Sequence, residues 1–216
     1  MHNSVQNLLN IKKNIKSKFN FYQSIKIIAV SKTHPIEQIK PLIDYGHVDF
    51  GENKVQEAVT KWSEIKNKNT KIKLHLIGKL QTNKVKYAVK IFDYIHSVDN
   101  EKLAKKIAEE QNKNNKNIKI FIQVNIGDEA QKSGISKNKL NNFYLYCVEL
   151  KLNVEGLMCI PPEGQNSDRF FKDLKSMNES LGLKKLSMGM SSDYISAIEN
   201  SATHVRIGSN IFGNRS

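Results

Sequence analysis

The chain has 216 residues, of which 39% are hydrophobic and 25% are charged. This composition is typical of a folded soluble protein rather than a disordered one, and the length suits one domain better than two. No apolar run approaches the roughly 20 residues of a membrane helix, and the N-terminal segment lacks the apolar core of a signal peptide. We therefore expect one domain over residues 1–216 and no membrane partner.

The formal net charge of +13 raises nucleic acid as a partner class. However, Arg169, Arg206 and Arg215 are the only arginines in the sequence, and arginine is the usual reader of bases. The lysines are spread along the chain, often beside Asn and Ile, as in KNKNTKIK. We interpret them as solvated surface and expect no nucleic acid as the main function.

The two cysteines, Cys147 and Cys159, cannot form a disulfide framework and lack the spacing of zinc ligands. We expect two buried thiols in a cytoplasmic protein, because that compartment keeps thiols reduced. The histidines show no metal-ligand spacing either, so no metal site is expected. His75 and His96 lie within apolar runs and are interpreted as hydrogen-bonded core residues.

Short β-branched runs alternate with amphipathic stretches along the chain. A leading amphipathic helix is predicted over residues 5–15. The predicted strands cover residues 25–32, 47–52, 74–78, 92–98, 118–126, 154–160, 184–190 and 203–208. The predicted helices between them cover residues 36–43, 55–65, 83–90, 103–108, 140–148, 170–177 and 194–198.

Strict alternation of strands and helices predicts a parallel sheet with right-handed crossovers. Eight strand–helix units after a leading helix favour a closed (β/α)8 TIM-type barrel in the α/β class. An open doubly wound sheet is the alternative, because a sequence pattern cannot show closure. In a barrel, functional side chains lie at the carboxyl ends of the strands and in the loops that follow.

Lys32 directly follows the apolar run IIAVS, so it is expected at the mouth of the barrel. Partial desolvation there would lower the pKa of its amine, and a neutral amine can attack an aldehyde to form a Schiff base. The alternative is an ordinary strand-end lysine whose amine reaches solvent.

The segments SMGMSSD and RIGSN each join a strand to a helix start. Ser191 or Ser192 is predicted as the N-cap of one helix, and Gly208 with Ser209 precedes the other. Free backbone N–H groups at helix starts bind phosphate, and the last two strand–helix joints of a barrel frequently do so. Ordinary capping without an anion is the alternative.

Arg206 ends the last predicted strand, where an inward-facing guanidinium needs an acceptor. A ligand carboxylate, a phosphate or an aromatic ring nitrogen would serve. A salt bridge to another barrel residue is the alternative.

The segments AVSKTHP, DFGENKVQE, LHLIGKLQTNK, IHSVD, IQVNI, KSGI, GLMCIPP, LSMGMSSD and VRIGSNIFG occur in order over residues 29–213. As an ordered set they resemble the pyridoxal phosphate (PLP) homeostasis proteins (YggS/PROSC type). The departures are mild. Lys54 stands where an aromatic residue is common, and Lys79 stands at a variable position.

This resemblance implies an alanine racemase-like barrel, the type III fold of PLP proteins. It also implies that PLP is held as a Schiff base on Lys32. Asn53 in FGEN would lie near the cofactor ring, and Arg206 would face the pyridine nitrogen and weaken the ring as an electron sink. The remaining cofactor-binding positions, which include the phosphate-binding set, are Met190, Ser191, Gly208 and Ser209.

The resemblance implies a PLP carrier and regulator in vitamin B6 and amino-acid homeostasis, with PLP-dependent apoenzymes as possible acceptors, rather than an enzyme. An alanine racemase has a second domain that supplies a catalytic tyrosine, and this sequence ends eight residues after Gly208. Two-base racemisation needs a second acid or base, and the sequence offers no candidate. We expect a monomer without catalytic residues. The alternative is a PLP-dependent amino-acid racemase-like enzyme.

Overall fold

The computed structural model describes residues 1–213, so Arg215 lies outside the described residues. Eight parallel strands form a closed barrel in the order β1 to β8, with β8 paired to β1. The closed barrel expected from the sequence is confirmed, and the open sheet is wrong. The strands are β1 (Lys26–Val30), β2 (Asp49–Glu52), β3 (Lys73–Leu76), β4 (Tyr94–Val98), β5 (Lys119–Gln123), β6 (Asn153–Met158), β7 (Lys185–Ser187) and β8 (His204–Ile207).

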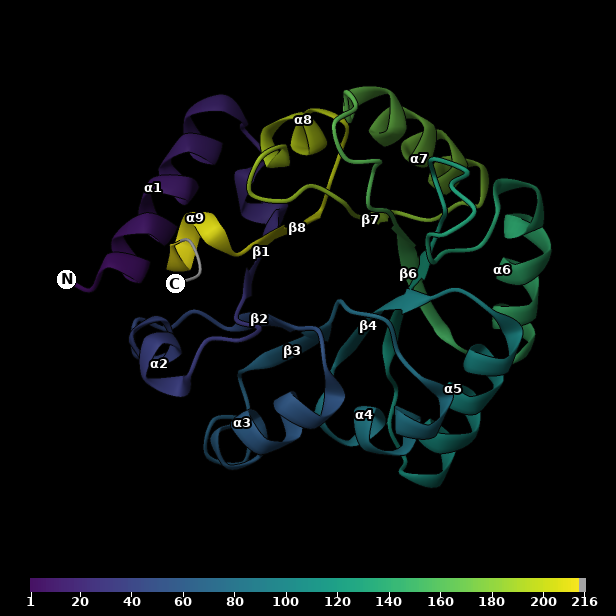
Figure 1. Cartoon of the computed structure of the whole chain (residues 1–216), viewed down its shortest axis with the longest axis horizontal. Coiled ribbons are helices and arrows are strands. Elements are labelled where there is room, and N and C mark those ends of the chain that lie inside the picture. Colours follow the sequence, from purple (N-terminus) through teal and green to yellow (C-terminus); the bar gives the residue numbers. More distant parts are fainter. Residues whose placement is uncertain (214–216) are drawn as a thin grey trace.

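Helices surround the barrel on the outside (Figure 1). The leading helix α1 packs beside α9 and α2, and its Asn7 side chain donates a hydrogen bond of 3.0 Å to the backbone carbonyl of Ile211. The α-helices are α1 (Asn3–Lys18), α2 (Ile36–Asp44), α3 (Val55–Lys68), α4 (Val85–Ile91), α5 (Glu101–Lys113), α6 (Leu140–Glu149), α7 (Asp168–Ser180), α8 (Tyr194–Glu199) and α9 (Ser209–Phe212).

The strands are buried on both faces, which is why they appear in the sequence as continuous apolar runs rather than alternating ones. Their outer side chains join those of the helices in one large apolar core. Burial of this kind, at about 25 cal/mol per Å² of apolar surface, supplies most of the driving force for folding. Among residues 1–213, no helix is both long enough and apolar enough to cross a membrane.

Several aromatic and imidazole rings lie inside the barrel. His75, His96 and His204 are buried there, and Phe121 lies 4.5 Å from His96 and 5.0 Å from His204 between ring centroids. Both predicted core histidines, His75 and His96, are buried and hydrogen-bonded as expected. A small apolar cluster separate from the large core completes the interior; it consists of Tyr94, Phe121 and Met158.

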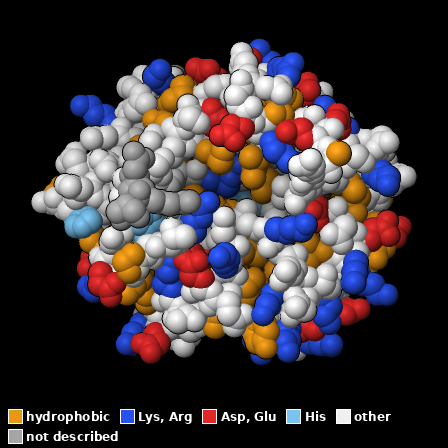
Figure 2. Space-filling view, viewed as in Figure 1, with side chains coloured by type: hydrophobic (Ala, Val, Ile, Leu, Met, Phe, Trp, Pro, Cys, Tyr) orange, Lys and Arg blue, Asp and Glu red, His pale blue; other side chains and the backbone are white. Residues whose placement is uncertain are grey.

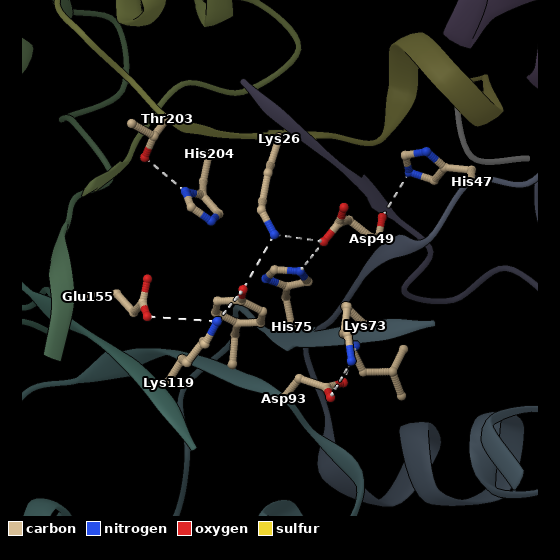
Figure 3. Close-up of polar contacts among 12 residues, drawn as sticks. Lys26, His47, Asp49, Lys73, His75, Asp93, Lys119, Glu155, Thr203 and His204 are labelled. Atoms are coloured by element: carbon tan, nitrogen blue, oxygen red, sulfur yellow. Dashed lines mark hydrogen bonds and ion pairs between the residues drawn. The ribbon is translucent and has the colours of Figure 1, made fainter. Parts of the chain in front are cut away.

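The amino-terminal end of the barrel is closed by ion pairs. A lysine begins each odd-numbered strand, as expected where alternate strands contribute one layer of side chains. Figure 3 shows several of these lysines beside the carboxylates that neutralise them. The pairs are Lys26–Asp49, Lys73–Asp93, Lys119–Glu155 and Lys185–Glu155.

Both cysteines are free and fully buried, as expected, with Cys147 in α6 and Cys159 directly after β6. Burial raises the pKa of each thiol to about 12. Because the thiolate is the reactive form, neither cysteine should react readily with a disulfide reagent at neutral pH in the folded protein. Colorimetric titration should show slow labelling in buffer and two thiols per chain in denaturant. Rapid labelling in buffer would contradict this burial.

Candidate functional site

A cavity of about 570 Å³ opens at the carboxyl ends of the strands. The structure brings all seven residues predicted to bind a cofactor to its wall, although they come from four separate parts of the chain. They are Lys32, Asn53, Met190, Ser191, Arg206, Gly208 and Ser209.

The remaining described wall residues were not among the predicted site residues. Ile77 and Ile160 follow β3 and β6, where apolar residues cannot be distinguished by sequence from core residues. Ser192 and His34 also line the cavity; the former was considered only as a helix cap. Among the described lining residues, Lys32 and Arg206 supply basic side chains and there is no carboxylate. The wall therefore favours an anionic ligand.

The turn that carries Lys32 is fixed by its neighbours. The Ser31 amide donates to the carbonyl of Gly51 (2.9 Å), and the Ser31 hydroxyl donates to Glu52 Oε1 (2.7 Å). On the other side of Lys32, Thr33 has φ of +66°, which is the left-handed region that a threonine rarely adopts. The Thr33 amide donates to Glu57 Oε1 (2.7 Å), so a carboxylate stabilises this conformation.

A buried ion-pair cluster stands behind this turn, and we call it the Lys61 clamp: Lys61, Glu52, Glu57 and Trp62. The Lys61 amine lies 3.0 Å from Glu52 Oε1 and 2.9 Å from Glu57 Oε1, and it also donates to the Ser31 carbonyl (3.0 Å). The Trp62 indole donates to Glu52 Oε1 (2.9 Å). The clamp therefore ties helix α3 to both sides of the Lys32 turn. The sequence did not predict the contacts of the clamp. Glu57, Lys61 and Trp62 lie in a helix pattern, which does not show that they contact Glu52 in a strand.

The segments that follow β7 and β8 contact each other at the cavity wall. The Gly208 amide donates to Ser191 Oγ (3.3 Å), and the Asn210 side chain donates to the Ser191 carbonyl (2.8 Å). A Cβ at Gly208 would lie 3.4 Å from Val30 Cβ, which is an ordinary van der Waals contact, so Gly208 packs against the end of β1. Hydroxyl and amide groups are thereby gathered at one end of the cavity, near the start of α9.

The predicted N-cap of α8 is wrong. Neither Ser191 nor Ser192 caps the helix, because α8 begins at Tyr194 and Asp193 occupies the residue before it. The Asp193 carboxylate accepts the Met190 amide (2.7 Å), which closes a turn after Gly189, whose φ is +88°. Helix α8 therefore begins one or two residues later than the cap pattern predicts, and both serines line the cavity instead.

Arg206 is buried, with only 4% of its surface exposed. Its guanidinium donates to Ser187 Oγ (2.8 Å) and to the carbonyl of Cys159 (2.9 Å). Burial lowers the pKa of Arg206 from its ordinary value. Among the described residues no carboxylate forms an ion pair with it, so the predicted alternative of a salt bridge is wrong for this part of the chain. No group of three or more His, Cys, Asp or Glu within residues 1–213 could hold a metal ion.

Comparison with known proteins defines the class first. The sequence matches the family described as alanine racemase, N-terminal domain, over residues 6–216. An alanine racemase from Clostridium difficile has the same fold, with a TM-score of 0.75 at 16% identity over 99% of this chain and 57% of that one.

Closer relatives then identify the family. Proteins named pyridoxal phosphate homeostasis protein are 40% identical in Aquifex aeolicus, over 88% of this chain and 87% of the relative, and 36% identical in Pasteurella multocida, over 97% of both. The chain belongs to this family of pyridoxal phosphate homeostasis proteins, as its ordered motifs predicted. PipY of Synechococcus elongatus, solved with PLP bound, superimposes with a TM-score of 0.87 at 32% identity over 97% of this chain and 100% of that one.

Proposed function

We propose that this protein holds PLP in the cavity through Lys32 and takes part in PLP homeostasis. The observation that carries the proposal is the character of the wall, which combines Lys32 and Arg206 with three serine hydroxyls and contains no described carboxylate. A volume of about 570 Å³ suits a small cofactor. The PLP-bound structure of PipY and the names of the relatives support the same ligand.

Each wall residue has a role in this proposal. Lys32 offers the amine that joins the PLP aldehyde as a Schiff base. Ser191, Ser209 and the Gly208 backbone bind the phosphate, and Arg206 faces the pyridine nitrogen. Asn53 and Met190 lie beside the ring. PLP itself would supply an aldehyde and an electron-withdrawing ring.

We place the protein among carriers and regulators rather than enzymes, with PLP-dependent apoenzymes as acceptors. Relatives named for homeostasis support this role. Because one chain forms the cavity, residues 1–216 would act as a single domain and a monomer. The two free, buried cysteines suit the cytoplasm. On the face in Figure 2, blue basic side chains are interspersed with red acidic ones, which does not favour nucleic acid as the main partner.

Borohydride reduction tests the proposal directly. Reduction of the PLP-loaded protein followed by peptide mass mapping should place the cofactor on Lys32 alone. The Lys32→Ala variant should lose the visible absorption band of lysine-bound PLP, whereas Lys54→Ala, which changes a lysine that does not line the cavity, should keep it. A colourless protein that takes up no added PLP would overturn the proposal, and so would a label on another lysine.

One observation favours a racemase-like enzyme as a second candidate. His34 lines the same cavity as Lys32, its Nδ1 lies 2.8 Å from Gln38 Oε1, and its ring stacks on Phe212 with centroids 4.6 Å apart. Lysine and histidine could act as two bases. Exchange of the α-proton in a panel of amino acids would distinguish the two functions. A carrier shows no steady exchange, whereas exchange that His34→Gln abolishes would establish the enzyme.

A further inference from the structure

A line of hydrogen-bonded side chains runs from Arg206 through the inside of the barrel to its opposite end. Arg206 donates to Ser187 Oγ (2.8 Å), which lies 2.8 Å from His96 Nδ1. His96 Nε2 lies 2.9 Å from His75 Nδ1, and His75 Nε2 lies 3.0 Å from Asp49 Oδ1. We call these five residues the histidine column. They come from five different strands, β8, β7, β4, β3 and β2.

All five members of the column are buried, and its two histidine rings are held by stacking. The His75 ring lies 4.3 Å from the Tyr94 ring at an interplanar angle of 9°, and the His96 ring lies 4.5 Å from Phe121 at 19°. Figure 3 shows the Asp49 end of the column, with the His75 ring directed at Asp49 and the Lys26 amine beside the same carboxylate. Stacking and burial therefore favour a single orientation of each ring.

The charge at Asp49 fixes where the protons of the column lie. Burial tends to raise the pKa of Asp49, but the hydrogen bond from His75 and the charge of Lys26 outweigh burial and lower it below its ordinary value. Asp49 is therefore an ionised acceptor at neutral pH, and His75 must carry its proton on Nε2. Burial lowers the pKa of His75 and of His96, so both rings are neutral.

A neutral His75 with its proton on Nε2 leaves Nδ1 as an acceptor. His96 must then donate from Nε2 to His75, which leaves His96 Nδ1 as an acceptor in turn. Among residues 1–213, only the Ser187 hydroxyl forms a hydrogen bond with that nitrogen, so Ser187 donates its single proton to His96. The Ser187 oxygen is left to accept, and Arg206 donates to it. Every donor in the column thus points from Arg206 toward Asp49.

We propose that Ser187, His96, His75 and Asp49 are positioning residues that hold the Arg206 guanidinium at the cavity wall by this single order of donors. The function of Arg206 toward the cofactor rests on the proposed PLP binding, whereas the order of donors does not. Asp49 acts on Arg206 through four successive hydrogen bonds. Reversing any one proton would place two donors or two acceptors face to face. A simple space-filling role for the histidines would give no such order.

Ring-nitrogen NMR on protein labelled with ¹⁵N-histidine tests the order without PLP. The two-bond proton couplings of His75 and His96, assigned with His→Gln variants, should show both protons on Nε2. Asp49→Asn permits either order, since an amide can donate or accept, and it should give mixed tautomers at His96 as well as at His75. Asp93→Asn, which changes a carboxylate at the same end of the barrel that pairs with Lys66 and Lys73, should leave both tautomers unchanged. A proton on Nδ1 of either histidine in the unaltered protein would overturn the proposal.

Cofactor affinity tests the effect on Arg206. Ser187→Ala and Asp49→Asn should each weaken PLP binding by about three- to tenfold, the usual range for one lost hydrogen bond. The double variant should bind no more weakly than Ser187→Ala alone, since the column is already broken. His204→Gln, which removes a buried histidine outside the column, should change affinity by less than about twofold. Additive losses would overturn the positioning role, whereas failure of PLP binding in the unaltered protein would overturn only the proposed function.

Discussion

Replacing Lys61 with methionine should lower the free energy of unfolding by about 3–5 kcal/mol, the range for breaking a buried ion pair on one side. Methionine keeps most of the apolar stem of lysine but removes the amine. Glu52 is fully buried, and among the described residues its Oε2 already has no hydrogen-bond partner. Loss of Lys61 would leave this carboxylate with only the neutral donors Ser31 and Trp62.

Urea unfolding followed by circular dichroism measures this loss of stability. Two further variants serve as its controls. Lys40→Met removes another lysine that pairs with a carboxylate four residues away, but here the two side chains are 68% and 60% exposed. Its effect should be below about 1 kcal/mol. Adding Glu52→Gln to Lys61→Met removes the stranded charge and should restore part of the stability. Equal effects of Lys61→Met and Lys40→Met would show that the clamp does not stabilise the fold.

The free energy of unfolding should also fall steeply as the pH drops from about 6.5 to about 4. Burial lowers the pKa of His47 from 6.5 to about 4 in the folded protein. Between these values the unfolded chain binds a proton that the folded chain does not, so acid favours unfolding. At 1.36 kcal/mol per unit, His47 alone accounts for about 3 kcal/mol across this window. Burial lowers the pKa of His75, His96 and His204 in the same direction.

Urea midpoints measured at intervals across this pH window test the prediction. His47→Gln keeps a side-chain donor for the Asp49 carbonyl, which His47 Nε2 contacts at 2.9 Å, but it cannot titrate. This variant should show a shallower fall than the unaltered protein. His2→Gln changes an exposed histidine and should leave the slope unchanged. A stability that stays flat between pH 6.5 and 4 would contradict the buried, neutral state of these histidines.

The barrel could be predicted because the hydrophobic pattern of each strand and helix, and the alternation of strands with helices, can be seen locally in the sequence. Each apolar run of five or so residues identified a strand without reference to any other part of the chain, and Lys32 was located because the cavity lies at strand ends. The start of α8 was predicted wrongly because Ser191 and Ser192 both fit a capping pattern. The turn that excludes them depends on the left-handed Gly189 and on Asp193.

The Lys61 clamp and the histidine column could not be predicted, because both depend on contacts across the barrel. His75 and His96 are 21 residues apart, and Ser187 follows His96 after a further 91. No spacing rule connects such residues, so their burial could be predicted but their partners could not. The partner of Glu52 could not be predicted either. Glu52 ends a predicted strand, whereas Lys61 lies in a helix pattern that is typical of solvent-exposed lysines.

The seam where β8 pairs with β1 has a consequence for the way the protein is made. Ile28 of the first strand lies in register with Arg206 of the last, so the wall of the cavity is shared between the two ends of the chain. Pairing partners so distant in sequence meet late, because closing a long loop has a large entropic cost. During translation, Lys32 leaves the ribosome long before Arg206 and Gly208 are synthesised. A nascent chain therefore cannot form the cavity until its last strand has been released.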